Sequence, residues 1–119
     1  MLTIGLDKTD EFNQVANKEL DENIASMEDV DNDVLTSANL EQILKNLHQI
    51  KGLATMVDKE NITTIASLLY RVLEIHKEKH SVVELKIIHD SIVAIRSIFN
   101  KETTTEVKIE NELKEILSK

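Results

Sequence analysis

Residues 39–57 read NLEQILKNLHQIKGLATMV, with apolar side chains recurring at intervals of three and four positions. The recurring residues are Leu40, Ile43, Leu44, Leu47, Ile50, Ala54 and Val57. Each residue of an α-helix is rotated by about 100° from the one before, so this spacing gathers the apolar side chains on one face. The stretch therefore predicts an amphipathic helix whose apolar face packs against a hydrophobic core.

Similar patterns occur on both sides of this stretch. They predict further helices at about 10–30, 60–78, 81–99 and 104–118, the fourth of them opening on a capping box formed by Ser81 and Glu84. Outside the most apolar segment, 60–78, the stripes consist of Phe12, Val15, Ala16, Leu20, Ile24 and Met27, then Leu85, Ile88, Ile92, Ile95 and Phe99, and finally Val107, Ile109, Leu113, Ile116 and Leu117. The chain has no proline and only two glycines, which favours helix throughout.

Short connections between long amphipathic helices favour antiparallel neighbours. We therefore expect an all-α protein: an antiparallel up-down four-helix bundle at about 8–100, with an appended fifth C-terminal helix at about 104–118. The 119 residues fit a single domain, 1–119.

The composition narrows the range of functions. There is no cysteine, which excludes disulfides and thiolate metal sites, and 22 acidic residues against 14 basic ones give a net charge of −8. That balance argues against nucleic acid as a partner, because phosphate binding requires clustered lysine and arginine. We find neither an apolar run of about 18 residues nor a secretory signal, so we expect a cytoplasmic protein without membrane insertion.

Gly52 is unexpected within a helix, because a glycine there costs about 1 kcal/mol relative to alanine. His48 lies one turn earlier, at the boundary between the apolar face and solvent, and Lys51 lies between the two. A neutral imidazole is a good nucleophile near pH 7, and a nearby ammonium offsets charge on a transferring phosphoryl group. The residues themselves leave two explanations open: a partner approaches the helix at Gly52, or the glycine serves a kink or close helix packing.

The segment HQIKGLA, residues 48–54, resembles the H-x-x-K-G-x-A motif of histidine phosphotransfer (HPt) domains. The likeness is greatest to the N-terminal phosphotransfer domain of the chemotaxis histidine kinase CheA, a place that the start at Met1 fits. It covers nearly the whole chain, including the acidic first helix, the leucine-rich third and the extra fifth. It implies that His48 is phosphorylated, that Lys51 stabilises charge, and that Gly52 opens the surface to a partner.

The resemblance also implies two partners. They are a histidine kinase catalytic domain, which supplies the phosphoryl group, and a response-regulator receiver domain, whose aspartate accepts it. The sequence has no P-loop or other nucleotide-binding signature, so the chain is expected to hold no cofactor and to act as a phosphoryl carrier without its own ATP site.

Three positions depart from the CheA pattern. Where those domains carry a histidine and a glutamate near the phosphorylated imidazole, this chain has Ser67 and Tyr70. The resemblance places Ser67 near the site and lets Tyr70 contact the imidazole of His48 through its hydroxyl group. Asp58 replaces a glycine at a turn position where aspartate is acceptable.

These departures keep two alternatives open: a stand-alone or hybrid-kinase phosphorelay HPt domain, and a non-phosphorylated helical adaptor with a degenerate motif. A metal site formed by His76, His80, Glu84 and His89 is disfavoured. His76 falls on an apolar stripe and His80 falls outside the helices, so we expect no metal.

Overall fold

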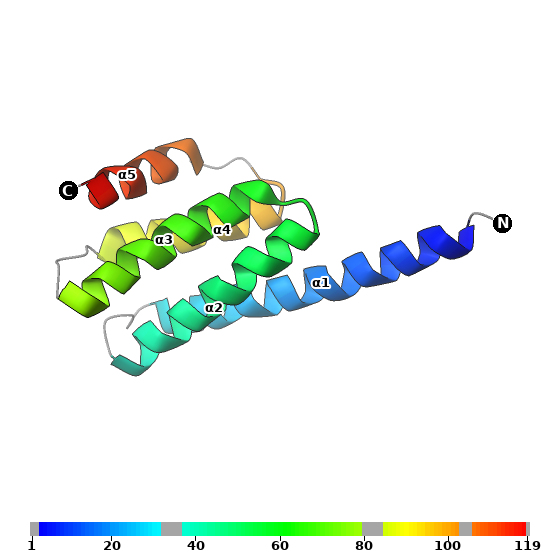
Figure 1. Cartoon of the computed structure of the whole chain (residues 1–119), viewed down its shortest axis with the longest axis horizontal. Coiled ribbons are helices and arrows are strands. Elements are labelled where there is room, and N and C mark those ends of the chain that lie inside the picture. Colours follow the sequence, from blue (N-terminus) through cyan, green and yellow to red (C-terminus); the bar gives the residue numbers. More distant parts are fainter. Residues whose placement is uncertain (1–2, 32–36, 80–84, 103–105, 119) are drawn as a thin grey trace.

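The computed structural model describes residues 3–31, 37–79, 85–102 and 106–118. These residues form five α-helices and no strand: α1 (Thr3–Val30), α2 (Ser37–Met56), α3 (Glu60–Lys79), α4 (Leu85–Phe99) and α5 (Glu106–Ser118) (Figure 1). The predicted all-helical class is confirmed. The capping box of Ser81 and Glu84, and His80, lie outside the described residues.

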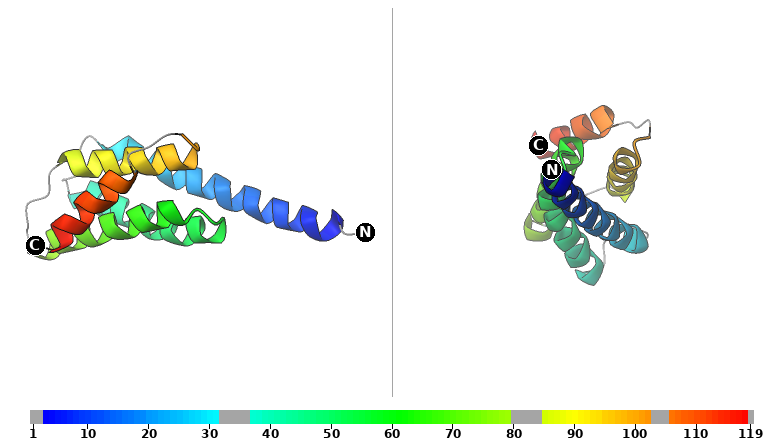
Figure 2. Two further views of the ribbon diagram at one scale, coloured as in Figure 1. Left: turned by 90° about the horizontal axis from the view of Figure 1, so that it is seen from above. Right: turned by 90° about the vertical axis from the view of Figure 1, so that its right-hand side faces the viewer.

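The helices pack around a common core. Helix α2 contacts α1 and α3, α4 contacts α3 and α1, and α5 contacts α3 and α4. Successive helices run back and forth along the long axis of the molecule (Figure 1). Helix α1 is about 42 Å long at 1.5 Å per residue, and its N-terminal end extends well beyond the other helices (Figures 1 and 2).

The core is built from the predicted apolar faces. Large side chains with less than 2% exposure come from the first four helices, and they are Leu20, Ile24, Met27, Ile43, Leu47, Ile50, Ile62, Ile65, Leu69, Leu73, Ile88 and Ile92. Helix α5 adds Ile109 and Leu113. Burial of such side chains is the main stabilising term of the fold, because each one removed from water contributes about 1.5–3 kcal/mol.

The ends of several predicted apolar faces are not buried. The first helix begins at Thr3, not near residue 10, and its residues Phe12 and Val15 are 52% and 59% exposed. This end of α1 extends past α2 and α3, so it lacks a helix to pack against (Figure 2). Leu85 and Val107, in the first turns of α4 and α5, are also exposed. The prediction that these four residues belong to the core was wrong.

A chain of amides joins α1 to α2. Asn46 is 5% exposed. It donates to Asn23 Oδ1 over 3.0 Å and accepts from Gln42 Nε2 over 3.0 Å. Gln42 also reaches Ser26 Oγ at 3.3 Å. Because a buried amide left without partners is costly, these contacts favour one register of α2 against α1.

A sharp turn connects α2 to α3. The amide of Lys59 donates to the carbonyl of Ala54 over 2.8 Å, and that of Asp58 donates to Thr55 over 3.3 Å. This is the Schellman pattern, which requires a left-handed residue after the helix. Asp58 occupies that position with φ 59°. Aspartate tolerates this region better than most residues, which explains how it can stand where glycine is usual.

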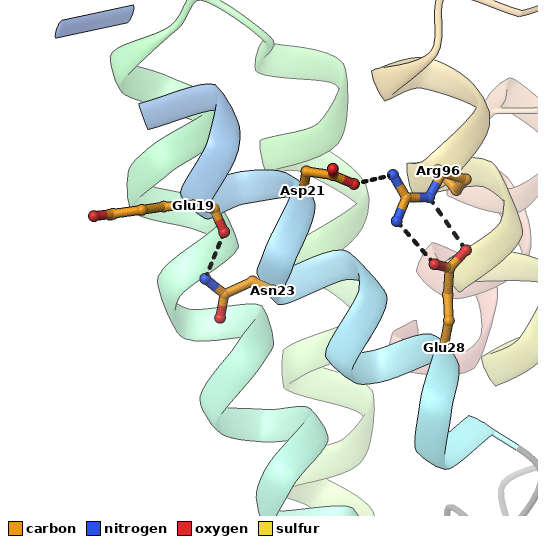
Figure 3. Close-up of polar contacts among 5 residues, drawn as sticks. All are labelled: Glu19, Asp21, Asn23, Glu28 and Arg96. Carbon is orange, nitrogen blue, oxygen red and sulfur yellow. Dashed lines mark hydrogen bonds and ion pairs between the residues drawn. The ribbon is translucent and has the colours of Figure 1, made fainter. Parts of the chain in front are cut away.

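Arg96 of α4 holds α1 in place from the side opposite α2 (Figure 3). Its guanidinium forms two hydrogen bonds to Glu28, at 3.2 and 2.8 Å, and a third to Asp21. The hydrogen bond to Glu28 is the main cause that raises the pKa of Arg96, partial burial opposes it, and Asp21 adds to the rise. Arginine is suited to this role because its planar fork matches a carboxylate.

We expect Arg96→Met to lower the free energy of unfolding by about 1 kcal/mol, because the pairs are lost and two carboxylates remain unpaired in a partly exposed setting. Urea denaturation followed by circular dichroism measures the change. The control is Lys86→Met, which removes the ion pair with Asp90 within α4 and is expected to cost no more than about 0.5 kcal/mol. Equal effects of the two variants would contradict a specific contribution of Arg96.

Candidate functional site

The register of α2 places His48 at the surface. Leu47 is fully buried, whereas His48 and Gln49 are both exposed. Since side chains rotate by about 100° per residue, burial of Leu47 turns the next side chain away from the core. The imidazole of His48 is therefore accessible to another molecule while its backbone is fixed by a packed helix.

Tyr70 of α3 faces this imidazole across the groove between the two helices. The ring centroids of His48 and Tyr70 are 6.4 Å apart, and the ring planes are tilted by 45°. The ammonium of Lys51 lies 5.0 Å from the centroid of the Tyr70 ring, a distance at which a cation is attracted to the aromatic face. Tyr70 thus neighbours both the nucleophile and the nearest cation on α2.

Gly52 leaves the surface beside His48 open. A Cβ atom built on Gly52 meets no heavy atom of the described residues within 4 Å, and the helix continues unbroken through this position. Close helix packing therefore does not explain the glycine. The hydroxyl of Thr55 donates to the carbonyl of Lys51 over 2.9 Å, which satisfies one acceptor in this turn.

His48 borders a shallow groove of about 420 Å³ between α2 and α3. The groove is lined by Glu41, Leu44, Lys45, His48, Tyr70, Glu74, Lys77 and Glu78. Lys77 forms an ion pair with Glu41 across the groove. Its hydrogen bond to Glu41 is the main cause that raises the pKa of Lys77 above the ordinary value. The groove thus presents charges of both signs beside the imidazole.

Several groove residues were not singled out from the sequence. Glu74 and Glu78 follow Tyr70 by four and eight residues, a spacing that puts all three on one helix face. That spacing was the signal that could have identified them once Tyr70 was placed at the site. Ser67, one turn before Tyr70, is half-buried and does not line the groove, although it was expected near the site.

The other described histidines lie elsewhere. His89 of α4 pairs with Asp31 at the end of α1, and His76 is half-buried on α3. Within the described ranges, no three side chains among histidine, aspartate and glutamate come together as metal ligands would. No described helix is both long enough and apolar enough to cross a membrane.

An exposed imidazole, a cation beside it and an uncovered stretch of helix can support attack on an electrophile that a partner delivers. Searches for a matching family model, for a similar curated protein and for a similar solved structure all gave no match.

Proposed function

We propose that this chain is a histidine phosphotransfer domain of two-component signalling, phosphorylated on His48. The observation that carries the proposal is the exposed His48 on a packed helix, one turn from a glycine with open space in front of it. The sequence resemblance to CheA-type domains selects a phosphoryl group as the electrophile. On this proposal the chain serves a chemotaxis kinase, with a phosphorelay intermediate as the alternative within the same family.

The proposed architecture is that of such domains: an antiparallel up-down bundle of α1 to α4 with α5 appended. The helix contacts are in keeping with it, because α1 to α4 contact one another in a closed order and α5 contacts only α3 and α4 among the pairs with substantial contact. In this arrangement α2 and α3 carry the site, and α4 and α5 lie on the other side of the core.

The proposed reaction has two steps. In the first, Nε2 of the neutral His48 imidazole forms a bond to phosphorus while the bond from phosphorus to the donor breaks, and the leaving group takes that electron pair. In the second, a carboxylate oxygen of a receiver aspartate forms the new bond and the bond from phosphorus to Nε2 breaks. Lys51 stabilises negative charge on the phosphoryl oxygens in both steps.

The proposed partners are a kinase catalytic domain as donor and a response-regulator receiver as acceptor. Each would dock over α2 at the His48–Gly52 surface. The acidic residues of a receiver's phosphorylation site complement Lys45 and Lys51, and such complementarity chiefly raises the rate of encounter. The substitution of Tyr70 for a charged residue favours one alternative of another class, a helical adaptor that binds receivers without accepting phosphate.

Gly52→Gln tests the docking surface. We expect this variant to raise the free energy of unfolding by about 0.5–1 kcal/mol, because glutamine is the better helix former. It should accept phosphate from the small donor phosphoramidate at the wild-type rate, yet transfer it to a receiver domain at least about tenfold more slowly, since a side chain then occupies the path of the receiver. Rapid quenching and intact-mass measurement of both proteins give the rates.

The matched control for this test is Ala38→Gln, which adds the same side chain at an exposed position near the start of α2. Its transfer rate should equal that of the wild type. If Gly52→Gln transferred as fast as Ala38→Gln, partner approach over Gly52 would be refuted. If the wild type bound receivers but gained no phosphoryl group, the adaptor would replace the carrier.

A further inference from the structure

The aromatic ring of Tyr70 is the common neighbour of the two groups on α2 that the proposed reaction uses. Its centroid lies 6.4 Å from that of the His48 ring and 5.0 Å from the ammonium of Lys51. Tyr70 itself is half-buried and packs against the hydrophobic core, so its ring has a fixed position. Lys51 and His48, by contrast, extend from the surface of α2.

Fixing a lysine ammonium is a physical requirement at such a site. A lysine side chain has four rotatable bonds, and when it is free its charge is spread over many positions. An ammonium that must move into place when the phosphoryl group arrives contributes less than one already positioned there. The face of an aromatic ring attracts a cation and so confines it.

We infer that Tyr70 is a positioning residue, which acts through the face of its ring and holds the Lys51 ammonium beside the phosphoryl group that His48 receives. This inference rests on the proposed function and deepens it. It differs from a contact between the tyrosine hydroxyl and the imidazole, because it assigns the effect to the ring and routes it through Lys51. It therefore predicts that phenylalanine replaces Tyr70 and that an aliphatic side chain does not.

The reaction chosen for the test is transfer from phosphoramidate, which needs no partner protein. Nε2 of His48 attacks phosphorus, the bond between phosphorus and nitrogen of the donor breaks, and ammonia leaves with the electron pair of that bond. Nδ1 keeps its proton, so the product is the protonated phosphohistidine with the charge conserved. The initial rate, followed by intact mass, reports how well the site stabilises the phosphoryl oxygens.

The experiment is a double-mutant cycle with Tyr70→Leu and Lys51→Met, accompanied by Tyr70→Phe. We expect Tyr70→Leu to slow phosphorylation about fourfold, which corresponds to about 0.8 kcal/mol, and Tyr70→Phe to stay within about twofold of the wild type. In the Lys51→Met background, Tyr70→Leu should cause no further slowing. Circular dichroism confirms that each variant is folded.

Three results would overturn the inference. They are an equal slowing by Tyr70→Leu with and without Lys51, a loss of rate in Tyr70→Phe as large as in Tyr70→Leu, and a faster Tyr70→Leu, which would make the ring a restraint on the lysine. In each of these cases the wild type still gains phosphate on His48, so the proposed function survives. A wild type that gains none refutes both together.

A second measurement does not depend on the folding of Tyr70→Leu. In NMR spectra of the wild type and of Tyr70→Phe, the methylene protons next to the Lys51 ammonium should be shifted upfield by the ring current of residue 70. Lys45, which lines the same groove and has no recorded aromatic contact among the described residues, is the internal reference. Equal shifts for Lys51 and Lys45 would contradict the placement of Lys51 over the ring.

Discussion

His48→Gln is expected to gain no phosphoryl group from phosphoramidate under conditions that modify the wild type completely. Glutamine keeps a polar side chain of similar length but has no nucleophilic nitrogen. The side chain at this position is exposed, and it has no part in the core. We therefore expect the free energy of unfolding to change by less than about 0.5 kcal/mol. Intact mass and urea denaturation measure the two effects.

The matched control for this variant is His89→Gln. His89 is also an exposed histidine, with a side chain that pairs with Asp31 and lies on α4, away from the groove. This variant should be phosphorylated as fast as the wild type. If His48→Gln were modified like the wild type, or if His89→Gln lost the modification, the assignment of His48 would be refuted.

Leu47→Ala is expected to lower the free energy of unfolding by about 3 kcal/mol. Leu47 is fully buried among the helices, and truncation of such a leucine removes buried apolar surface and leaves a cavity, at a cost of about 2–5 kcal/mol. The loss is a large part of the roughly 5–15 kcal/mol that stabilises a domain. A shift of the urea denaturation midpoint, followed by circular dichroism, measures it.

This prediction also tests the register that exposes His48. The control is Gln49→Ala, two positions along and exposed, which is expected to change stability by no more than about 0.5 kcal/mol. A rotation of α2 that turned His48 inward would move Leu47 toward solvent. Similar effects of the two variants would therefore contradict the position of α2 and, with it, the accessibility of His48.

Much of the fold could be predicted from the periodicity of apolar residues. The predicted bounds of α2 and α3 agree with the structure to within about two residues, because their stripes are long and regular. The N-terminal part of α1 could not be predicted in this way. Phe12 and Val15 continue the apolar stripe of α1, yet they are exposed. Periodicity shows which face of a helix is apolar, but it does not show where the neighbouring helix ends.

The site was less accessible to sequence reasoning. The exposure of His48 follows from the register of its own helix. The approach of Tyr70 to His48 and Lys51 depends on how α3 lies against α2, which local periodicity does not determine. The buried Asn46 was missed for the same reason. Its partner Asn23 lies on α1, 23 residues earlier in the chain, and an asparagine on a helix is ordinarily read as solvent-exposed.

The position of the phosphoryl group tests the central claim most directly. The wild-type chain would be treated with phosphoramidate, digested at neutral pH to preserve the acid-labile bond, and mapped by fragment mass. We predict a single phosphoryl group on His48, and none on His76 or His89. A group on another histidine would contradict the assigned site. A folded chain with no group at all would show that the motif does not work and that the protein is not a phosphoryl carrier.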